Sequence, residues 1–295
     1  MSIAEYWLKN EKVGEFGIKY LDDKLRGILR TDLILIGART GAGKSTLAEL
    51  IALHNAKKGY KVHLFSLENF DGDVYASRVY NLYRQITRNY ELNQRDFACG
   101  EFDKDIAALV KAESIAKKDF ENILISSGDT KYNAQRICEE ISKTVNENQT
   151  KLVILDHLDY IDSEGIDQNQ EMTKLMSKLR EIQKEFKVAI IAFSHLRKNV
   201  NKDLYAIPSI DEFIGSSNKV KQATGVILVS PDDKTNEENY GSSKKSTWMC
   251  IRKLRMGGIS NMCARIIYDR KVNVYADEYE ECVVNYNGSK VDVVR

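Results

Sequence analysis

A glycine-rich stretch in the first quarter of the chain carries the residues best suited to chemistry. An apolar run at 33–36 precedes it, and residues 47–55 follow it with helical spacing. A strand, a glycine-rich turn, Gly-Lys-Ser and a helix form the context of a phosphate-binding P-loop, where backbone N–H groups and the helix dipole face an anion. We therefore predict a nucleoside triphosphate site made by Ala38, Arg39, Thr40, Gly41, Ala42, Gly43, Lys44, Ser45 and Thr46.

Two side chains of this stretch have specific expected roles. Lys44 would reach the β- and γ-phosphates, and the Ser45 hydroxyl would be a ligand of Mg²⁺. The strict pattern G-x-x-x-x-G-K-[ST] places glycine at position 38, whereas this chain has Ala38 and puts Gly37 one position early. Because the other glycines and the Lys-Ser pair remain, the prediction of a P-loop stands.

Three polar side chains follow other apolar runs and are candidates for the same site. Asp156 ends the run 152–155 and would hold Mg²⁺ as a Walker B aspartate. Glu68 follows the predicted strand 60–67 and would act as general base on the attacking water, although the pattern alone favours a solvated loop glutamate. His195 follows the run 188–193 and would sense the γ-phosphate, although a lone histidine is more often structural.

Composition limits the function classes. The 295 residues include 44 Lys and Arg against 43 Asp and Glu, so any nucleic-acid contact must come from local patches. Five scattered cysteines without a C-x-x-C pair predict free thiols, a reducing compartment and no zinc module. With neither a signal peptide nor an apolar run of transmembrane length, we predict a cytoplasmic protein without a membrane partner.

The order of expected elements predicts an α/β fold. Apolar runs alternate with helical stretches up to about residue 245, which is typical of a mainly parallel sheet flanked by helices. Four short strands are expected beyond it, at 246–252, 261–268, 271–275 and 281–285, as antiparallel additions. We predict an N-terminal arm at 1–15 and one domain at 16–295.

Several of these pieces occur in an order that resembles a known family. They are residues 38–46, Ser66-Leu67-Glu68, Leu155-Asp156-His157-Leu158, Ser194-His195-Leu196-Arg197 and residues 210–216. Together they resemble the RecA-like motor domain of DnaB-family hexameric replicative helicases, over residues 16–277. The match looks closest to the branch of phage primase-helicases and Twinkle. The resemblance implies a RecA-like P-loop NTPase fold, ATP or another NTP with Mg²⁺, a homo-oligomer expected to be a hexameric ring, single-stranded DNA, and a primase or loader as further partner.

The resemblance also suggests roles for basic residues late in the chain. Lys253 and Arg255 match cations that reach the γ-phosphate of a neighbouring subunit; without the resemblance they are an exposed basic strand end. DNA would be held by loops within 196–222, where five lysines and arginines against three acids give a net charge of +2. The expected DNA contacts are Arg197, Lys198, Lys219 and Lys221.

One departure from the family leaves two functions open. The family pattern Arg-Gly-Ser-Gly reads Ile214-Gly215-Ser216-Ser217 in this chain. Our first hypothesis is an ATP-dependent, ring-forming DNA helicase or translocase that hydrolyses NTP at subunit interfaces. The alternative is a RecA-like ATPase that acts as a nucleotide-dependent switch or scaffold for a protein partner without unwinding.

Overall fold

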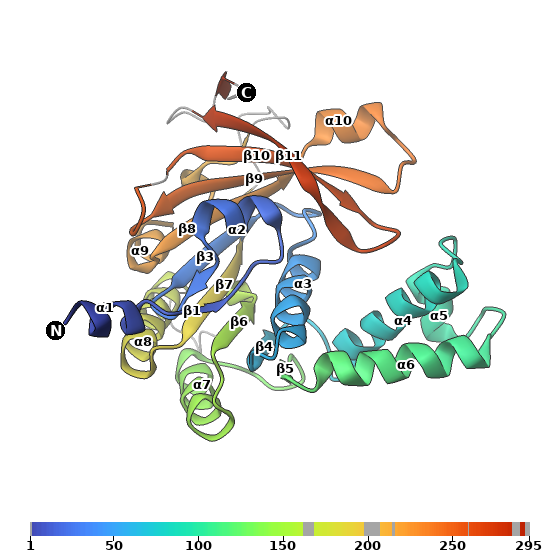
Figure 1. Cartoon of the computed structure of the whole chain (residues 1–295), viewed down its shortest axis with the longest axis horizontal. Helices are drawn as coiled ribbons and strands as arrows, with labels where there is room; N and C mark the ends of the chain where they lie inside the picture. The colour runs from blue at the N-terminus through green and yellow to red at the C-terminus, as the bar shows by residue number, and fades with distance from the viewer. Residues whose placement is uncertain are drawn as a thin grey trace.

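The computed structural model describes residues 2–161, 168–197, 207–213, 216–258, 260–284 and 290–292. Within them the chain folds as α/β, with one large sheet carrying helices on both faces (Figure 1). The predicted DNA contact Lys198 and the departure at Ile214-Gly215 lie outside the described residues.

The parallel part of the sheet forms its centre. Its strand order is β8-β3-β7-β6-β4-β5, and every neighbouring pair in this run is parallel. The side chains of β3, β4 and β6 are all buried, as expected of apolar strands covered on both faces. The bounds are β3 Leu33–Ala38, β4 Val62–Ser66, β5 Ile123–Ser127, β6 Leu152–Asp156, β7 Ala189–His195 and β8 Gly225–Pro231.

Antiparallel strands extend the sheet beyond β8, as predicted. They are β9 (Lys244–Leu254), β10 (Met262–Asp269), β11 (Val274–Val284) and β12 (Lys290–Asp292), in that order. The prediction of separate strands at 271–275 and 281–285 was wrong, because β11 runs without interruption through the acidic residues between them. A strand far from the centre exposes part of its surface, so the acidic pairs Asp277-Glu278 and Glu280-Glu281 do not end it.

Helices cover the two faces of the sheet with separate apolar cores. On one face, α2 (Lys19–Leu25) and α3 (Lys44–Lys57) bury Tyr20, Leu47 and Ile51 against the strands. On the other, α7 (Ala134–Asn148) and α8 (Gln168–Phe186) bury Ile141 and Leu179. Met172 and Met176 of α8 belong to that core.

A helical arm projects from the sheet beyond β4 and β5 (Figure 1). It consists of α4 (Asp73–Thr87), α5 (Gln94–Cys99) and α6 (Ile106–Phe120). These helices enclose their own small apolar cluster around Tyr83 and Ala112. The arm is therefore packed internally as well as against the domain.

The N-terminal segment joins the domain earlier than predicted. Strand β1 (Lys12–Gly14) pairs with β2 (Ile28–Leu29), and Val13 is buried. Asn55 of α3 accepts a hydrogen bond from the Glu15 backbone at 2.9 Å. The body of the domain thus includes residues 12–15, and helix α1 (Ile3–Lys9) precedes it with Ile3 and Trp7 exposed.

The prediction that all cysteines are free thiols was wrong for two of them. Cys250 of β9 and Cys263 of β10 lie opposite each other in register, with Cα atoms 4.0 Å apart, and form a disulfide. Sequence spacing does not reveal which strands become neighbours, so this pairing could not be anticipated. Within the described ranges, no helix combines the length and apolar character needed to cross a membrane.

Short helical segments complete the loops around the parallel strands. They are the 3₁₀ turns η1 (Leu158–Tyr160) and η2 (Ile210–Glu212), and the helices α9 (Ser216–Gln222) and α10 (Asp233–Glu238). Both η1 and α9 lie close in sequence to strand ends, and they matter for the site described next.

Candidate nucleotide site

The predicted site residues meet at the carboxyl edge of the parallel strands. Ala38 at the end of β3 lies opposite His195 at the end of β7, and Ser66 at the end of β4 lies opposite Asp156. Glu68 follows two residues after β4. Ligands of open α/β sheets bind at this edge, because parallel strands bring their carboxyl ends together there.

The conformation of the P-loop explains the departure at position 38. Gly41 and Gly43 have positive φ angles of 79° and 74°, which favour glycine. A Cβ on Gly37 would lie 2.5 Å from the Phe213 ring, so that position is restricted sterically. Ala38 is instead a buried residue of strand β3, where a methyl group is accommodated.

Lys44 lies between two carboxylates. Its Nζ is 3.2 Å from Asp156 Oδ1 and 4.0 Å from Glu68 Oε2. Although buried, Lys44 Nζ and Asp156 Oδ1 form no well-aligned hydrogen bond within the described part of the chain. Buried charged atoms need partners, so this pair fits a site completed by an anion at Lys44 and a cation at Asp156.

The donor atoms suit Mg²⁺. The Ser45 hydroxyl borders the cavity next to the P-loop, and Asp156 contributes a buried carboxylate. Magnesium prefers hard oxygen ligands of this kind together with phosphate oxygens. Ser45 and Asp156 would therefore hold the ion that accompanies a bound nucleotide.

Sequence reasoning missed a polar network beside Asp156. The buried His157 ring places Nδ1 3.2 Å from Asp159 Oδ2 and Nε2 3.6 Å from Glu68 Oε2. Asp159 also accepts a hydrogen bond from the His195 backbone at 2.7 Å. The rings of His157 and His195 meet edge to face, with centroids 4.4 Å apart. The motif Asp156-His157-Leu158-Asp159 was visible in sequence, but nothing in it located these contacts.

Charge and burial act in opposite directions in this network. Burial alone would raise the pKa of Asp159, but the hydrogen bond from His157 and the charge of Lys219 outweigh it and hold that pKa well below its ordinary value. Burial and then the charge of Lys44 lower the pKa of His195 below 6.5. His195 is therefore neutral at pH 7 and can donate or accept a hydrogen bond at the phosphate end of the site.

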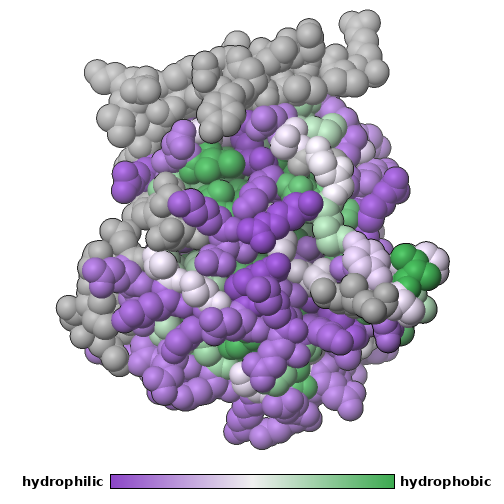
Figure 2. All heavy atoms as spheres, turned by 90° about the vertical axis from the view of Figure 1, so that its left-hand side faces the viewer, coloured by the Kyte–Doolittle hydropathy of each residue, from purple (hydrophilic) through white to green (hydrophobic). Residues whose placement is uncertain are grey.

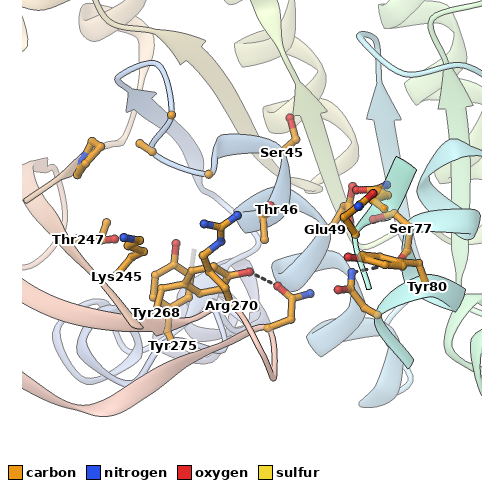
Figure 3. A pocket seen from close by; sticks show the side chains of 18 of the residues that line it. Ser45, Thr46, Glu49, Ser77, Tyr80, Lys245, Thr247, Tyr268, Arg270 and Tyr275 are labelled. Carbon is orange, nitrogen blue, oxygen red and sulfur yellow. Dashed lines mark hydrogen bonds between the residues drawn. The ribbon is translucent and has the colours of Figure 1, made fainter. Parts of the chain in front are cut away.

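A cavity of 1310 Å³ extends from the P-loop to the antiparallel strands and the helical arm. Figure 3 shows Ser45 and Thr46 in this cavity, with Tyr268, Arg270 and Tyr275 on one side. Glu49, Ser77 and Tyr80 line the opposite side (Figure 3). No sequence motif marks these residues, because their distance from the P-loop depends on how β10 and α4 pack.

Glu49 brings an unusual carboxyl group into this cavity. It lies on α3, and burial, followed by the nearby charge of Asp156, raises the pKa of Glu49 to about 8. The carboxyl is consequently protonated at pH 7 and can donate a hydrogen bond. A neutral acid here also avoids adding negative charge beside a site that binds phosphates.

Lys253 and Arg255 lie away from the P-loop of their own chain. Lys253 pairs with Val226 at the amino-terminal edge of the parallel strands, whereas the P-loop follows their carboxyl edge. Lys253 Nζ donates to the Val220 carbonyl at 2.5 Å, and Arg255 donates to the Lys221 carbonyl. Both cations thus hydrogen-bond the C-terminal carbonyls of α9.

Other cations gather near Arg255. It lines a cavity of 430 Å³ together with Arg180, Lys184 and Lys187. Burial and the neighbouring charges of Arg255 and Arg180 lower the pKa of Lys253. Figure 2, which views the molecule from the side of α1, α8 and α9, shows that hydrophilic side chains dominate this face.

The predicted DNA contacts have different environments. Arg197 and Lys221 are exposed, as DNA contacts would be. Lys219 is buried instead, and its Nζ lies 3.1 Å from Ser194 Oγ and 3.4 Å from Asp159 Oδ1. The prediction that Lys219 binds DNA is therefore corrected for this conformation, because its ammonium group faces the nucleotide site.

Comparisons with known proteins agree with this geometry. Residues 15–277 match the model of the DnaB-like helicase C terminal domain. The chain is 28% identical over 240 residues to the replicative DNA helicase DnaB of Mycoplasma pneumoniae, covering 76% of this chain and 48% of that protein. It is 27% identical over 258 residues to a probable replicative DNA helicase of Trieres chinensis, covering 83% and 53%. The chain thus spans about half the length of these curated relatives.

Solved structures show the same fold. An ATPase domain solved on its own superposes with a TM-score of 0.74 at 18% identity, covering 93% of this chain and 95% of that one. A DnaB-like replicative helicase, solved to show its interactions with primase, gives the same TM-score and identity, covering 90% and 62%. A KaiC-like protein of Pyrococcus horikoshii is less similar, with a TM-score of 0.58.

The sheet order and the likeness to the solved ATPase domain define a RecA-like P-loop fold. Because the family model covers most of the sequence, the chain belongs to the DnaB-like helicase C-terminal domain family, as the sequence resemblance predicted. Its finer placement with the phage primase-helicases and Twinkle stays a prediction.

Proposed function

We propose that the domain binds ATP, or another NTP, with Mg²⁺ and hydrolyses it to drive movement along single-stranded DNA as a ring-forming helicase. The observation that carries the proposal is the meeting of Lys44, Asp156, Glu68 and His195 at the P-loop, in a chain of the DnaB-like family. The family match favours this function over a nucleotide switch without unwinding.

Each residue of the site has a proposed role in hydrolysis. Lys44 binds the β- and γ-phosphates, Ser45 and Asp156 hold Mg²⁺, and Glu68 orients and deprotonates the attacking water. Neutral His195 hydrogen-bonds the γ-phosphate. The remaining loop residues 38–43 and Thr46 surround the phosphates, and the nucleoside lies in the cavity toward Tyr268 and Arg270.

A homo-oligomer, with a hexameric ring as the expected form, completes the site. Lys253 and Arg255 lie at the opposite strand edge from their own P-loop and so are placed to serve the γ-phosphate of a neighbouring copy. Their hydrogen bonds to α9 involve helix-end carbonyls, which water can satisfy when the cations leave.

The proposed DNA contacts are Arg197, Lys198 and Lys221, on segments that follow β7 or precede β8. A mildly basic loop of this kind holds the phosphate backbone rather than reading bases. A primase or loader is a further proposed partner. This proposal is supported by the structural neighbour whose interactions with primase have been described. A cytoplasmic location follows from this proposed function.

ATP turnover by the 295-residue chain, measured with and without poly(dT), tests the proposal. Turnover should rise with DNA, and single-particle mass measurement with a non-hydrolysable ATP analogue and poly(dT) should detect a ring-sized assembly. If the ATP turnover rate is the same with and without DNA and the chain remains monomeric, the helicase assignment is overturned while the NTPase assignment stands. Turnover that is absent altogether would overturn both.

A further inference from the structure

The network around Asp159 goes beyond the groups that hydrolysis by itself requires. Asp159 lies on η1, directly after the strand that ends with Asp156. One of its oxygens accepts from the His195 backbone at 2.7 Å and lies 3.2 Å from His157 Nδ1. Its other oxygen is 3.4 Å from Lys219 Nζ and 3.2 Å from Ser194 Oγ. One carboxylate therefore contacts two strand ends and helix α9.

Burial makes this arrangement specific. Lys219 is 3% exposed and His157 is 1% exposed, so both depend on partners within the protein. Removing one member of a buried ion pair leaves an uncompensated charge, which constrains both members to their positions. The pair Lys219–Asp159 thus ties α9 to the end of β6.

The same contacts determine how His157 faces the catalytic carboxylate. With Nδ1 directed at Asp159, the ring presents Nε2 toward Glu68 Oε2 at 3.6 Å. Nε2 is buried and has no hydrogen-bond partner among the described residues. An imidazole whose position is fixed by a carboxylate is a recurring way to orient a second group. Here the second group is Glu68.

We propose that Asp159 and Lys219 are positioning residues for ATP hydrolysis, which hold His157 and the His195 backbone in place and join α9 to the nucleotide site. This inference rests on the proposed ATPase function. These contacts connect the γ-phosphate end of the site to α9. The C-terminal carbonyls of α9 accept hydrogen bonds from Lys253 and Arg255. α9 therefore contacts elements of its own nucleotide site and the cations proposed for the neighbour's site.

A metal site is the competing interpretation of the same cluster. His157, Asp159 and His195 offer ligand atoms that all lie within 4.8 Å of one another. However, both Asp159 oxygens already accept hydrogen bonds, and the Lys219 ammonium lies where a cation would meet repulsion. The geometry therefore favours a hydrogen-bonded positioning network.

Steady-state ATPase kinetics of four variants test the proposal. Asp159→Asn and Lys219→Met should lower kcat by about 100-fold, because small misplacements of catalytic groups cost rates of this order. The affinity for a fluorescent non-hydrolysable ATP analogue should change by less than about threefold, since Lys44 and the P-loop are untouched. Lys219→Arg retains the charge but introduces a larger, planar head group at a buried position, so kcat should fall less than in Lys219→Met.

Lys24→Met is the matched control. It removes a lysine from the partly buried Lys24–Glu281 ion pair, with 2.7 Å between the charged atoms, which joins α2 to β11. It should leave kcat unchanged. If the original chain turns over ATP but Asp159→Asn and Lys219→Met match Lys24→Met, the positioning role is overturned and the ATPase function stands.

Two further measurements distinguish the positioning network from a purely structural ion pair and from a metal site. The double variant Asp159→Asn/Lys219→Met removes both charges; it should regain thermal stability lost in the single variants while kcat stays low. If the double variant recovers kcat as well as thermal stability, the ion pair is purely structural and the proposal is overturned. Activity that is lost with EDTA and returns only when Zn²⁺ is added together with Mg²⁺, and not with Mg²⁺ alone, would identify the cluster as a metal site and would also overturn the proposal.

Discussion

Lys44 and Arg255 are cations in two contrasting parts of the domain. Lys44 is buried at the carboxyl edge of the sheet, 3.2 Å from Asp156. Arg255 is exposed at the amino-terminal edge and hydrogen-bonds the Lys221 carbonyl. A buried cation cannot be separated from its counter-charge without a large free-energy cost. An exposed cation bonded to a helix-end carbonyl can instead hydrogen-bond water, because water can also satisfy that carbonyl. The contrast separates a preformed half of the site from a half that another copy would supply.

Lys44→Ala should produce the largest effect. It removes the cation that faces the phosphates and leaves Asp156 buried without its counter-charge. Both ATP turnover and binding of a fluorescent ATP analogue should be lost, by more than about 10³-fold in turnover. Isothermal titration and a coupled ATPase assay would measure the two effects. Retained binding would show that the P-loop alone holds the nucleotide and would weaken the contrast.

Arg255→Ala should separate turnover from binding. A cation supplied in trans stabilises the transition state, so turnover should fall on the order of 10³-fold. Nucleotide affinity of the free chain should be nearly unchanged, because Arg255 lies at the opposite edge of the sheet. Mixing this variant with Lys44→Ala should restore part of the turnover, since mixed rings contain some complete interfaces. A variant that hydrolyses ATP normally would refute the assignment in trans.

Glu49→Gln should have a smaller effect that depends on pH. At pH 7 the variant should bind nucleotide as the original chain does, because glutamine resembles the protonated acid. Above about pH 8 Glu49 loses its proton and adds a negative charge near Asp156 and the phosphates, so the original chain should bind ATP several-fold more weakly than Glu49→Gln. Titrations at about pH 7 and about pH 9 test this; parallel curves for both proteins would contradict it.

The smallest effect concerns stability outside both halves of the site. His63 is fully buried between Thr144 and Ser126, and burial lowers the pKa of His63 below 6.5. The unfolded chain binds this proton near pH 6.5 and the folded chain only at lower pH, so stability present above pH 6.5 is lost as pH falls through the folded pKa. The urea unfolding midpoint should therefore fall less on acidification in His63→Gln than in the original chain. The same dependence of the midpoint on pH in both proteins would contradict this.

The local part of the site was predictable from sequence. Gly43-Lys44-Ser45 and the strand end at Asp156 are recognised from their neighbours in sequence. A glycine-rich turn and a buried apolar run are each visible within a few consecutive residues. Parallel strands then bring these ends together by topology. The placement of Lys44 beside Asp156 and of Ala38 beside His195 follows that logic.

Contacts between distant segments were decided only by the tertiary structure. Lys219 contacts Asp159 across 60 positions of sequence, and its burial removed it from the predicted DNA contacts. Cys250 and Cys263 are joined because β9 and β10 pair in one register out of many.

Sequence by itself therefore determined the P-loop, the strand ends and the family, since each depends on short-range patterns. The packing of α9, β9 and β10 decided which distant residues meet the nucleotide site and which cations face away from it, because register and burial emerge only when the whole sheet is assembled.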